Sequence, residues 1–128
     1  MTTQEKIMTT KEVAQRVAEL CRQGKFEQAQ HDLFADEAES IEPASAAQQG
    51  LDINTKGLGN ILKKGEQWQN MTEHYYGGSV SEPIVAGNNF AFALRMDVAM
   101  KGQPRSTMEE ICVYEVKDGK VVSEQFFY

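Results

Sequence analysis

Residues 90–128 decide the fold, and they read FAFALRMDVAMKGQPRSTMEEICVYEVKDGKVVSEQFFY. Large apolar side chains alternate with smaller or polar ones over Phe90–Met100, which is the pattern of a strand with one buried face. Gly102-Gln103-Pro104 is a turn sequence, and Asp118-Gly119 is a strong hairpin signal. The stretch therefore predicts three consecutive antiparallel strands, over Phe90–Met100, Thr107–Val116 and Val121–Tyr128.

Further strand patterns precede this stretch. Glu73–Val80 alternates with period two, and Gly77-Gly78 inside it predicts a bulge or bend. Ile84–Ala86 is a short strand candidate, and Gly87-Asn88-Asn89 after it is a turn sequence. The second half of the chain is therefore an antiparallel meander.

Helical periodicity dominates the first half. Thr9 or Thr10 can cap a helix with Glu12 in its first turn and Gly24 after its end. Residues 25–35 predict a second short helix. A third is expected from a cap at Asn54 or Thr55 toward Met71. Between these helices a strand is predicted over Ala38–Glu42 and a loop over residues 43–52, because Pro43 cannot donate to a sheet.

Composition limits the function classes. The chain has 128 residues, enough for one domain, with a flexible start expected over residues 1–9. Its net charge of -6 argues against nucleic-acid binding. No signal peptide or membrane-spanning run is recognisable, so a cytoplasmic protein without membrane contact is expected, and Cys21 and Cys112 are expected to be reduced.

Three motifs carry a family resemblance: Gly24-Lys25-Phe26-Glu27, Leu33–Ala38 and Val113–Val121. In this order and at this length the chain resembles the SnoaL-like branch of the nuclear transport factor two superfamily, which includes the ketosteroid isomerases. The resemblance implies an α+β fold, in which three N-terminal helices and a cone-shaped, curved antiparallel sheet enclose a pocket. It also implies a small hydrophobic molecule as ligand and a homodimer formed through the outer face of the sheet.

The faces of the strands decide which side chains line that pocket. Phe90, Phe92, Leu94, Met96, Val98 and Met100 form the buried face of the long strand. In the next strand composition leaves open whether Glu109 or Glu110 points inward. The resemblance places Met108, Glu110 and Cys112 inside, together with Glu124, Phe126 and Tyr128 of the last strand. The outer face, proposed for dimerisation, would then carry Ile111, Val113, Val121 and Phe127.

Three residues are candidates for catalysis. By resemblance Glu42 matches the aspartate that shuttles protons in ketosteroid isomerases; the alternative is a solvated glutamate at a strand end. Glu110, if inward, needs a partner or a function, because a buried unpaired carboxylate is unstable. His74 exchanges protons near neutral pH and would pair with Glu42 or Glu110; the alternative is a histidine that only hydrogen-bonds at the helix end.

The remaining candidates are apolar and aromatic. The expected ligand-binding set is Trp68, Tyr76, Phe92, Leu94, Met96, Met108, Cys112, Glu124, Phe126 and Tyr128. The alternative for each aromatic residue is plain core. His31 and His74 lack ligand spacing, so no metal is expected, and no cofactor motif is present.

Two functions follow from these candidates. The first is a cofactor-independent acid–base enzyme of the isomerase, cyclase or dehydratase type that acts on a hydrophobic carbonyl compound. The second is a non-catalytic ligand-binding or dimerisation module; a core filled by side chains is a further possibility. The donor positions of ketosteroid isomerase correspond to Val17 and Cys112, so steroid isomerisation by the same apparatus is not expected.

Overall fold

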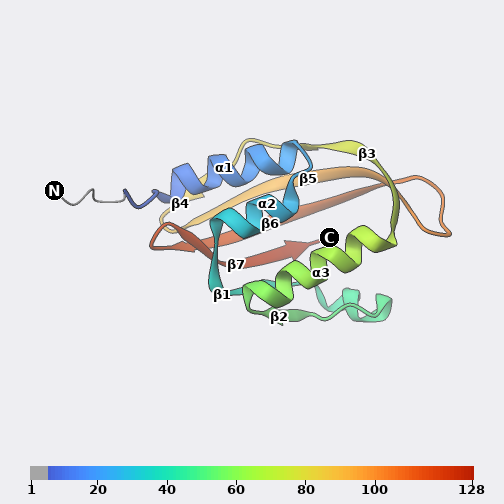
Figure 1. Cartoon of the computed structure of the whole chain (residues 1–128). Coiled ribbons are helices and arrows are strands. Elements are labelled where there is room, and N and C mark those ends of the chain that lie inside the picture. The colour runs from blue at the N-terminus through green and yellow to red at the C-terminus, as the bar shows by residue number, and fades with distance from the viewer. Residues whose placement is uncertain (1–5) are drawn as a thin grey trace.

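The computed structural model describes residues 6–128 as three helices packed on one side of a curled sheet (Figure 1). The helices are α1 (Thr10–Arg22), α2 (Phe26–Leu33) and α3 (Leu58–Met71), with a short 3₁₀ helix at Ala44–Gln49. The strands are β1 (Phe34–Ile41), β2 (Asn54–Lys56), β3 (Thr72–Val80), β4 (Ile84–Ala86), β5 (Asn89–Met100), β6 (Ser106–Lys117) and β7 (Lys120–Phe127). No helix in this described part is long and apolar enough to cross a membrane.

The sheet follows the order β2-β1-β7-β6-β5-β3, and β4 also pairs with β5. All pairs are antiparallel except β1 with β7, which run parallel. The fold is the expected α+β type, with this one parallel pair in addition. Because β1 and β7 run in the same direction, the residues that follow them, Glu42 and Tyr128, lie at the same end of the strand pair.

The helix α1 begins as its sequence predicts. The Thr9 hydroxyl accepts a hydrogen bond from the Glu12 backbone, and the Glu12 carboxylate accepts one from the Thr9 backbone. Within the stretch expected to be flexible, Met8 packs against the core, while residues 1–5 lie outside the described part. The inner side of α1 buries Val13, Val17, Leu20 and Cys21 against the sheet.

Two boundaries differ from the sequence prediction. The strand β1 begins at Phe34 instead of Ala38, because Phe34 is buried and pairs with Val121. Asn54 and Thr55 were expected to cap α3, but they form β2, where Thr55 pairs with Ser40. The helix α3 starts after Gly57, whose φ of 89° favours glycine.

The turns and the long strand agree with the prediction. Asp118 and Gly119 both have positive φ in the β6–β7 hairpin, and the register of β3 shifts between Tyr75 and Gly77, where a bulge was expected. Phe90, Phe92, Leu94, Met96 and Val98 are all buried on the helix-facing side. This row of side chains forms the part of the core that the sheet contributes.

One face assignment was wrong. Val121 was expected on the outer face, but it is fully buried in the core. The register between β6 and β7 shifts between Glu115 and Val116, so β7 contains an extra residue there. This bulge reverses the alternation, and Val121 therefore shares the inner face with Glu124.

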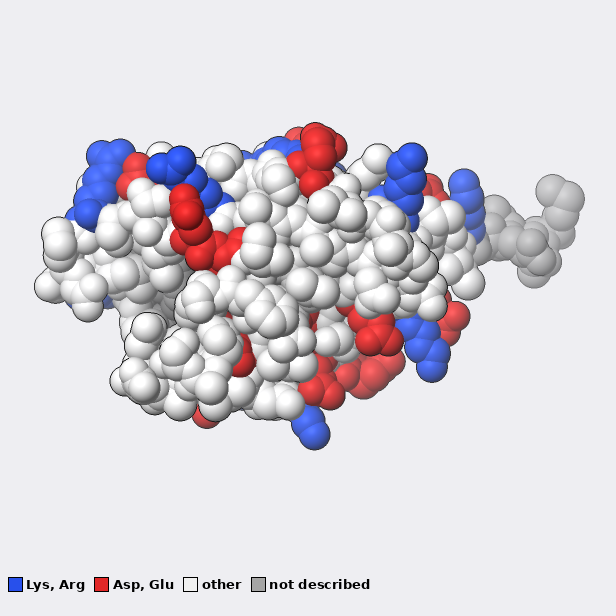
Figure 2. Space-filling view, turned by 180° about the vertical axis from the view of Figure 1, so that it is seen from behind, with Lys and Arg blue, Asp and Glu red and all other residues white. Residues whose placement is uncertain are grey.

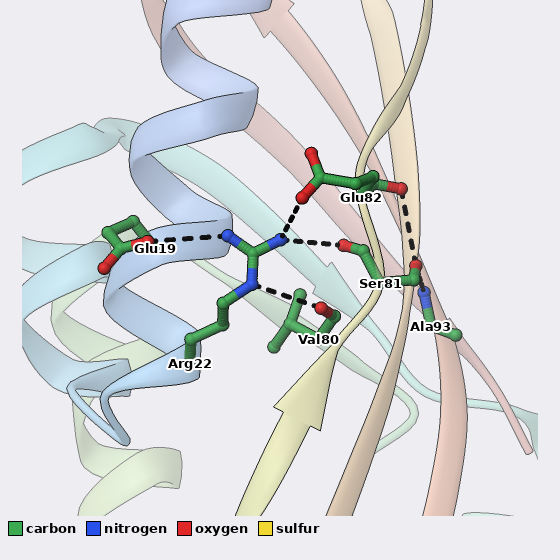
Figure 3. Close-up of polar contacts among 6 residues, drawn as sticks. All are labelled: Glu19, Arg22, Val80, Ser81, Glu82 and Ala93. Atoms are coloured by element: carbon green, nitrogen blue, oxygen red, sulfur yellow. Dashed lines mark hydrogen bonds and ion pairs between the residues drawn. The ribbon is translucent and has the colours of Figure 1, made fainter.

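Arg22 joins the end of α1 to the connection between β3 and β4 (Figure 3). Its guanidinium donates to the carbonyl oxygens of Val80 (3.2 Å) and Ser81 (3.3 Å), and lies 3.4 Å from the carboxylates of Glu19 and Glu82. The Ser81 hydroxyl in turn accepts a bond from the Ala93 backbone at 2.8 Å. The helix is thereby held over the edge of the sheet.

Replacing Arg22 should loosen this connection. Arg22→Met keeps most of the apolar length but removes all donors, so we expect the free energy of unfolding to fall by about 1–2 kcal/mol in urea titrations. Arg16→Met is the matched control, since Arg16 is exposed on the same helix. Equal effects of the two substitutions would contradict the role given to Arg22.

Candidate functional site

Two carboxyl groups point toward the helices from the inner face of the sheet. Glu124 on β7 is 3% exposed and lies opposite Tyr114 of β6. Glu110 on β6 is half-buried and lies opposite Leu94 of the buried row. Glu109 is exposed on the outer face, 3.8 Å from Arg95. The alternative left open by the sequence is therefore resolved in favour of Glu110.

Glu42 lies at the same site, just beyond the end of β1. Its side chain is only 12% exposed, so it is not a solvated strand-end residue. One carboxylate oxygen accepts a hydrogen bond from Lys64 Nζ at 3.1 Å, and the other accepts one from the Tyr128 hydroxyl at 2.9 Å. Lys64 comes from α3, so the helix, β1 and the residue after β7 meet at this carboxylate.

Ser40 connects these two parts of the site. It is fully buried on β1, and its hydroxyl donates to Glu124 Oε1 at 2.7 Å. The same hydroxyl oxygen accepts a bond from Lys64 Nζ at 2.6 Å. The Lys64 ammonium also lies 5.6 Å from the centre of the Phe126 ring. One cation thus serves two carboxyl groups through three hydrogen bonds.

The pKa values of the two inward glutamates are raised. Burial raises the pKa of Glu110 to about 7, and the nearby charge of Glu42 adds to this, while a hydrogen bond from the Cys112 thiol opposes it. Burial also raises the pKa of Glu124 to about 7, against the lowering influence of Ser40 and Lys64. Near neutral pH each carboxyl group is available in both protonated and charged forms, which suits proton transfer.

The two cysteines beside these carboxyl groups stay protonated. Burial raises the pKa of Cys21 to about 12, and it raises the pKa of the Cys112 thiol further. Both thiols are free, as the sequence predicts. A thiol that stays protonated is a poor nucleophile, because the thiolate is the reactive form. The Cys112 thiol instead donates a weak hydrogen bond to Glu110.

His74 and Tyr76 are not brought to the carboxyl groups. His74 pairs with Ala99 on the outer side of the sheet and is exposed. The bulge in β3 places Tyr76 on that side too, where its ring lies 4.2 Å from His74 and 3.8 Å from the Arg105 guanidinium. Tyr75 points inward instead, against Phe26. The inward placement predicted for His74 and Tyr76 is therefore wrong.

The other expected ligand-binding residues lie on the helix-facing side. Phe92, Leu94, Met96 and Cys112 are buried there. Trp68, Met108 and Phe126 are half-buried and pack against the same core. Tyr128 is half-exposed, but its hydroxyl reaches Glu42. These residues give the carboxyl groups a mainly apolar surrounding.

Two open hollows lie away from the carboxyl groups. One, of about 430 Å³, is at the α1–α2 turn and includes Phe26 and His31. The other, of about 310 Å³, lies between Met8 and Gly119. Glu42, Glu110 and Glu124 line neither, so a ligand pocket at the carboxyl groups stays a prediction. Within residues 6–128 no group of three or more His, Cys, Asp or Glu side chains is placed to hold a metal ion.

Ser40 and Lys64 were missed from the sequence, although a weak signal for each exists. Ser40 lies two residues from the buried Ala38 and two from Glu42, so strand alternation puts all three on one face. Lys64 is three residues after the buried Ile61 and four before Trp68, which is the spacing of one helix face. Neither signal predicts that the two side chains meet.

Comparisons with known proteins give a consistent family. Residues 8–128 match the family model described as the SnoaL-like domain. A Mesorhizobium loti structure described as a "putative SnoaL-like polyketide cyclase" is 34% identical, with a TM-score of 0.85, over 94% of this chain and all of that one. No curated protein matches significantly.

More distant structures share the fold. A Burkholderia pseudomallei NTF2-like protein of unknown function is 12% identical, with a TM-score of 0.78, over 94% of this chain and 92% of its own. TerC, crystallised with polyporic acid, is 14% identical, with a TM-score of 0.77, over the same shares of the two chains. At these identities the likeness concerns the fold alone.

The raised pKa of Glu124 predicts how stability depends on pH. The folded protein holds a proton on Glu124 up to about pH 7, whereas the unfolded chain releases it near the ordinary value of 4.5. The contribution of this proton to the free energy of unfolding is therefore fully present below pH 4.5 and is lost as the pH rises from 4.5 through 7. We expect Glu124→Gln to stabilise the protein at pH 8 by about 1–3 kcal/mol and to have little effect at pH 5.

Urea unfolding at the two pH values measures this difference. Glu109→Gln is the matched control, because Glu109 is exposed on the outer face of β6, and it should change the free energy of unfolding by less than about 0.5 kcal/mol. A loss of stability in Glu124→Gln that is the same at pH 5 and pH 8 would contradict the assignment.

Proposed function

This chain belongs to the SnoaL-like domain family, and from that membership and the carboxyl groups described above we propose that it binds a small, mainly apolar carbonyl compound and moves a proton on it. The ligand would lie on the helix-facing side of the sheet, where Glu42 and Glu110 adjoin apolar side chains. The reaction would be an isomerisation, cyclisation or dehydration, and it requires no cofactor.

The observation that carries this proposal is the environment of Glu110. Burial raises its pKa to about 7, so near neutral pH this carboxyl group donates a proton about as readily as it accepts one. Glu42, held in an ion pair with Lys64, lies close enough to influence that pKa. Two carboxyl groups in different environments are a recurring arrangement for acid–base catalysis.

The chemistry assigns one role to each carboxyl group. Glu42 would remove a proton from the carbon next to the carbonyl group, so that the C–H electron pair moves toward the carbonyl oxygen. Glu110, in its protonated form, would donate its O–H to that oxygen as negative charge develops there. Return of the first proton to another carbon completes an isomerisation. In a cyclisation the enolate carbon attacks a second carbonyl group, and the alkoxide formed there takes the proton that Glu42 removed.

The similar structures favour this substrate class. The 34% identical Mesorhizobium loti protein is described as a "putative SnoaL-like polyketide cyclase", and polyketides carry several carbonyl groups on a carbon skeleton. TerC was crystallised with polyporic acid. The buried row of Phe92, Leu94 and Met96 and the nearby Phe126 suit a mainly apolar compound.

A second function is favoured by one specific contact. Both carboxylate oxygens of Glu42 are already bonded, one to Lys64 and one to Tyr128. Both hydrogen bonds are made to the charged carboxylate, and both are weakened when Glu42 accepts a proton. A binding protein without catalysis needs no such change, so ligand binding alone is the alternative.

Proton exchange in deuterated water distinguishes the two functions. We expect the protein to catalyse exchange of the hydrogen next to the carbonyl group in some members of a panel of aromatic 1,3-dicarbonyl compounds, followed by proton NMR. Glu42→Gln and Glu110→Gln should each slow that exchange by about 100-fold or more, because each removes a proton-transfer group. Glu109→Gln should exchange at the wild-type rate.

Thermal shifts with the same panel complete the test. Compounds that raise the melting temperature of the wild-type protein but do not exchange would favour ligand binding alone. Wild-type exchange rates in both glutamine variants would contradict the assignment of Glu42 and Glu110.

The outer face of the sheet supports a second proposal, that two copies of the chain pair through it. Ile111 and Phe127 lie opposite each other on β6 and β7 and are 46% and 49% exposed. Figure 2, which views the molecule from behind, shows a broad uncharged area with most charged side chains near its outline. Covering the exposed apolar side chains of Ile111 and Phe127 would stabilise a dimer.

A charge on this face should prevent pairing. We expect sedimentation velocity to give a dimer for the wild-type chain and a monomer for Ile111→Lys, because the lysine would be desolvated in the interface. Met71→Lys, which changes an exposed methionine at the end of α3, should remain dimeric. A monomeric wild-type protein at micromolar concentration would contradict the proposal.

A further inference from the structure

Five side chains form an unbroken line of hydrogen bonds from the core to the surface. It runs from Glu124 to Ser40 (2.7 Å), to Lys64 (2.6 Å), to Glu42 (3.1 Å) and to Tyr128 (2.9 Å). Glu124, at one end, is 3% exposed, and Tyr128, at the other, is 50% exposed. The line thus joins a carboxyl group without solvent access to one at the candidate reaction site.

The two hydrogen bonds between Lys64 and Glu124 are both donated toward Glu124. The Lys64 ammonium donates to Ser40, and the Ser40 hydroxyl donates to Glu124. Ser40 accepts and donates at the same oxygen, which is the arrangement that passes a proton along a chain. A simple ion pair between Lys64 and Glu42 does not need this serine, and a buried hydroxyl is unfavourable unless it is bonded.

We propose that Ser40 and Lys64 are positioning residues through which Glu42 and Glu124 share one proton. After Glu42 has accepted a proton, one N–H bond of the Lys64 ammonium breaks as an O–H bond forms at Ser40, whose original proton passes to Glu124. Lys64 is then a neutral amine with a free electron pair, and it takes the proton of Glu42 as the O–H bond there breaks. Glu42 is a carboxylate again, Glu124 is protonated, and Lys64 and Ser40 are unchanged in charge.

This inference rests on the proposed function, in which Glu42 accepts a proton, and it gives Glu124 a purpose in it. Glu124 stores the proton in the core, so that Glu42 is ready for another transfer before the first proton is returned. The same hydrogen bonds carry the proton back by the reverse steps.

Few neighbours of Glu124 compete for this proton. The other titratable groups that face it are Cys112, Tyr114 and Glu110 from β6 and Cys21 from α1. Burial raises the pKa of both thiols and of the Tyr114 hydroxyl, so these three remain protonated near neutral pH. Glu110 alone titrates in the same range as Glu124, and Glu110→Gln identifies its NMR signal.

A double-mutant cycle on the titration of Glu124 tests the shared proton without a substrate. The carboxyl carbon of Glu124 is followed by NMR in the wild-type protein, Glu42→Gln, Ser40→Ala and the double variant. Because the nearby charge of Glu42 raises the pKa of Glu124, removing that charge should lower the titration midpoint of Glu124. We expect this shift to fall by about half or more when Ser40 is absent, because the connection is broken.

Repulsion through space predicts the opposite result. If the two carboxylates influence each other only by charge, Ser40→Ala leaves the shift unchanged or larger, and the proposal is overturned. Lys64→Met gives an independent measurement if Ser40→Ala does not fold. Shared protonation predicts a smaller shift in that variant, whereas direct repulsion predicts a larger one, since the positive charge between the carboxylates is gone.

Ser106→Ala is the matched control, because Ser106 is exposed at the start of β6 and should leave the shift unchanged. The outcome is separate from that of the exchange assay. Absence of turnover contradicts the proposed enzyme but leaves a shared proton measurable, and an undiminished shift contradicts the shared proton but leaves the enzyme assay unaffected.

Discussion

The Lys64 ammonium is the positive group that links the carboxyl groups of Glu42 and Glu124. Three glutamates lie at the helix-facing side of one sheet, two of them in positions where burial opposes their ionisation. A single cation from α3 bonds Glu42 directly and Glu124 through Ser40. Without it, the end of β1 and the middle of β7 would bring negative charge together in an apolar surrounding, which is strongly unfavourable. The position of α3 on the sheet and the chemistry of the site therefore depend on the same contact.

Opposing influences on the pKa values of Glu124 and Glu110 keep both carboxyl groups able to exchange protons. The ammonium and the Ser40 hydroxyl lower the pKa of Glu124, but they do not cancel the effect of burial. Glu110 lacks so close a cation and has only a weak thiol donor beside it. Both groups thus remain near the point at which a carboxyl group exchanges protons at neutral pH. The apolar row on β5 maintains that state by keeping water away.

Sequence periodicity predicted the parts of the fold that have an uninterrupted pattern. The alternation of Phe90–Met100, the hairpin at Asp118-Gly119 and the cap at Thr9 were all predictable, because each depends on neighbouring residues. Val121 was misplaced because a bulge in β7 changes the parity of the strand, and the alternation of the sequence does not show that bulge. In β3 a bulge was expected at Gly77-Gly78, but Tyr76 beside it was still assigned to the pocket. Asn54 and Thr55 look like helix caps, but pairing with β1 outweighs that local preference.

The candidate site was predictable only in part, for a related reason. Glu42 was found through the family resemblance, which also placed Glu110 and Glu124 inside. His74 was selected for its chemistry, although its strand turns it outward. Lys64 and Ser40 could not be paired from sequence, since 24 residues separate them and their contact depends on how α3 crosses β1.

The parallel pairing of β1 with β7 has a consequence for how the molecule is assembled. The bond between Ser40 and Glu124 spans 84 positions of the chain, and the bond between Glu42 and Tyr128 spans 86. During synthesis, Lys64 and Glu42 leave the ribosome long before either of these partners exists. The growing chain therefore carries an unfinished edge at β1 that the last strand must close, and contacts of such long range form slowly. The acidic site can therefore be completed only after the last strand of the chain has paired with β1.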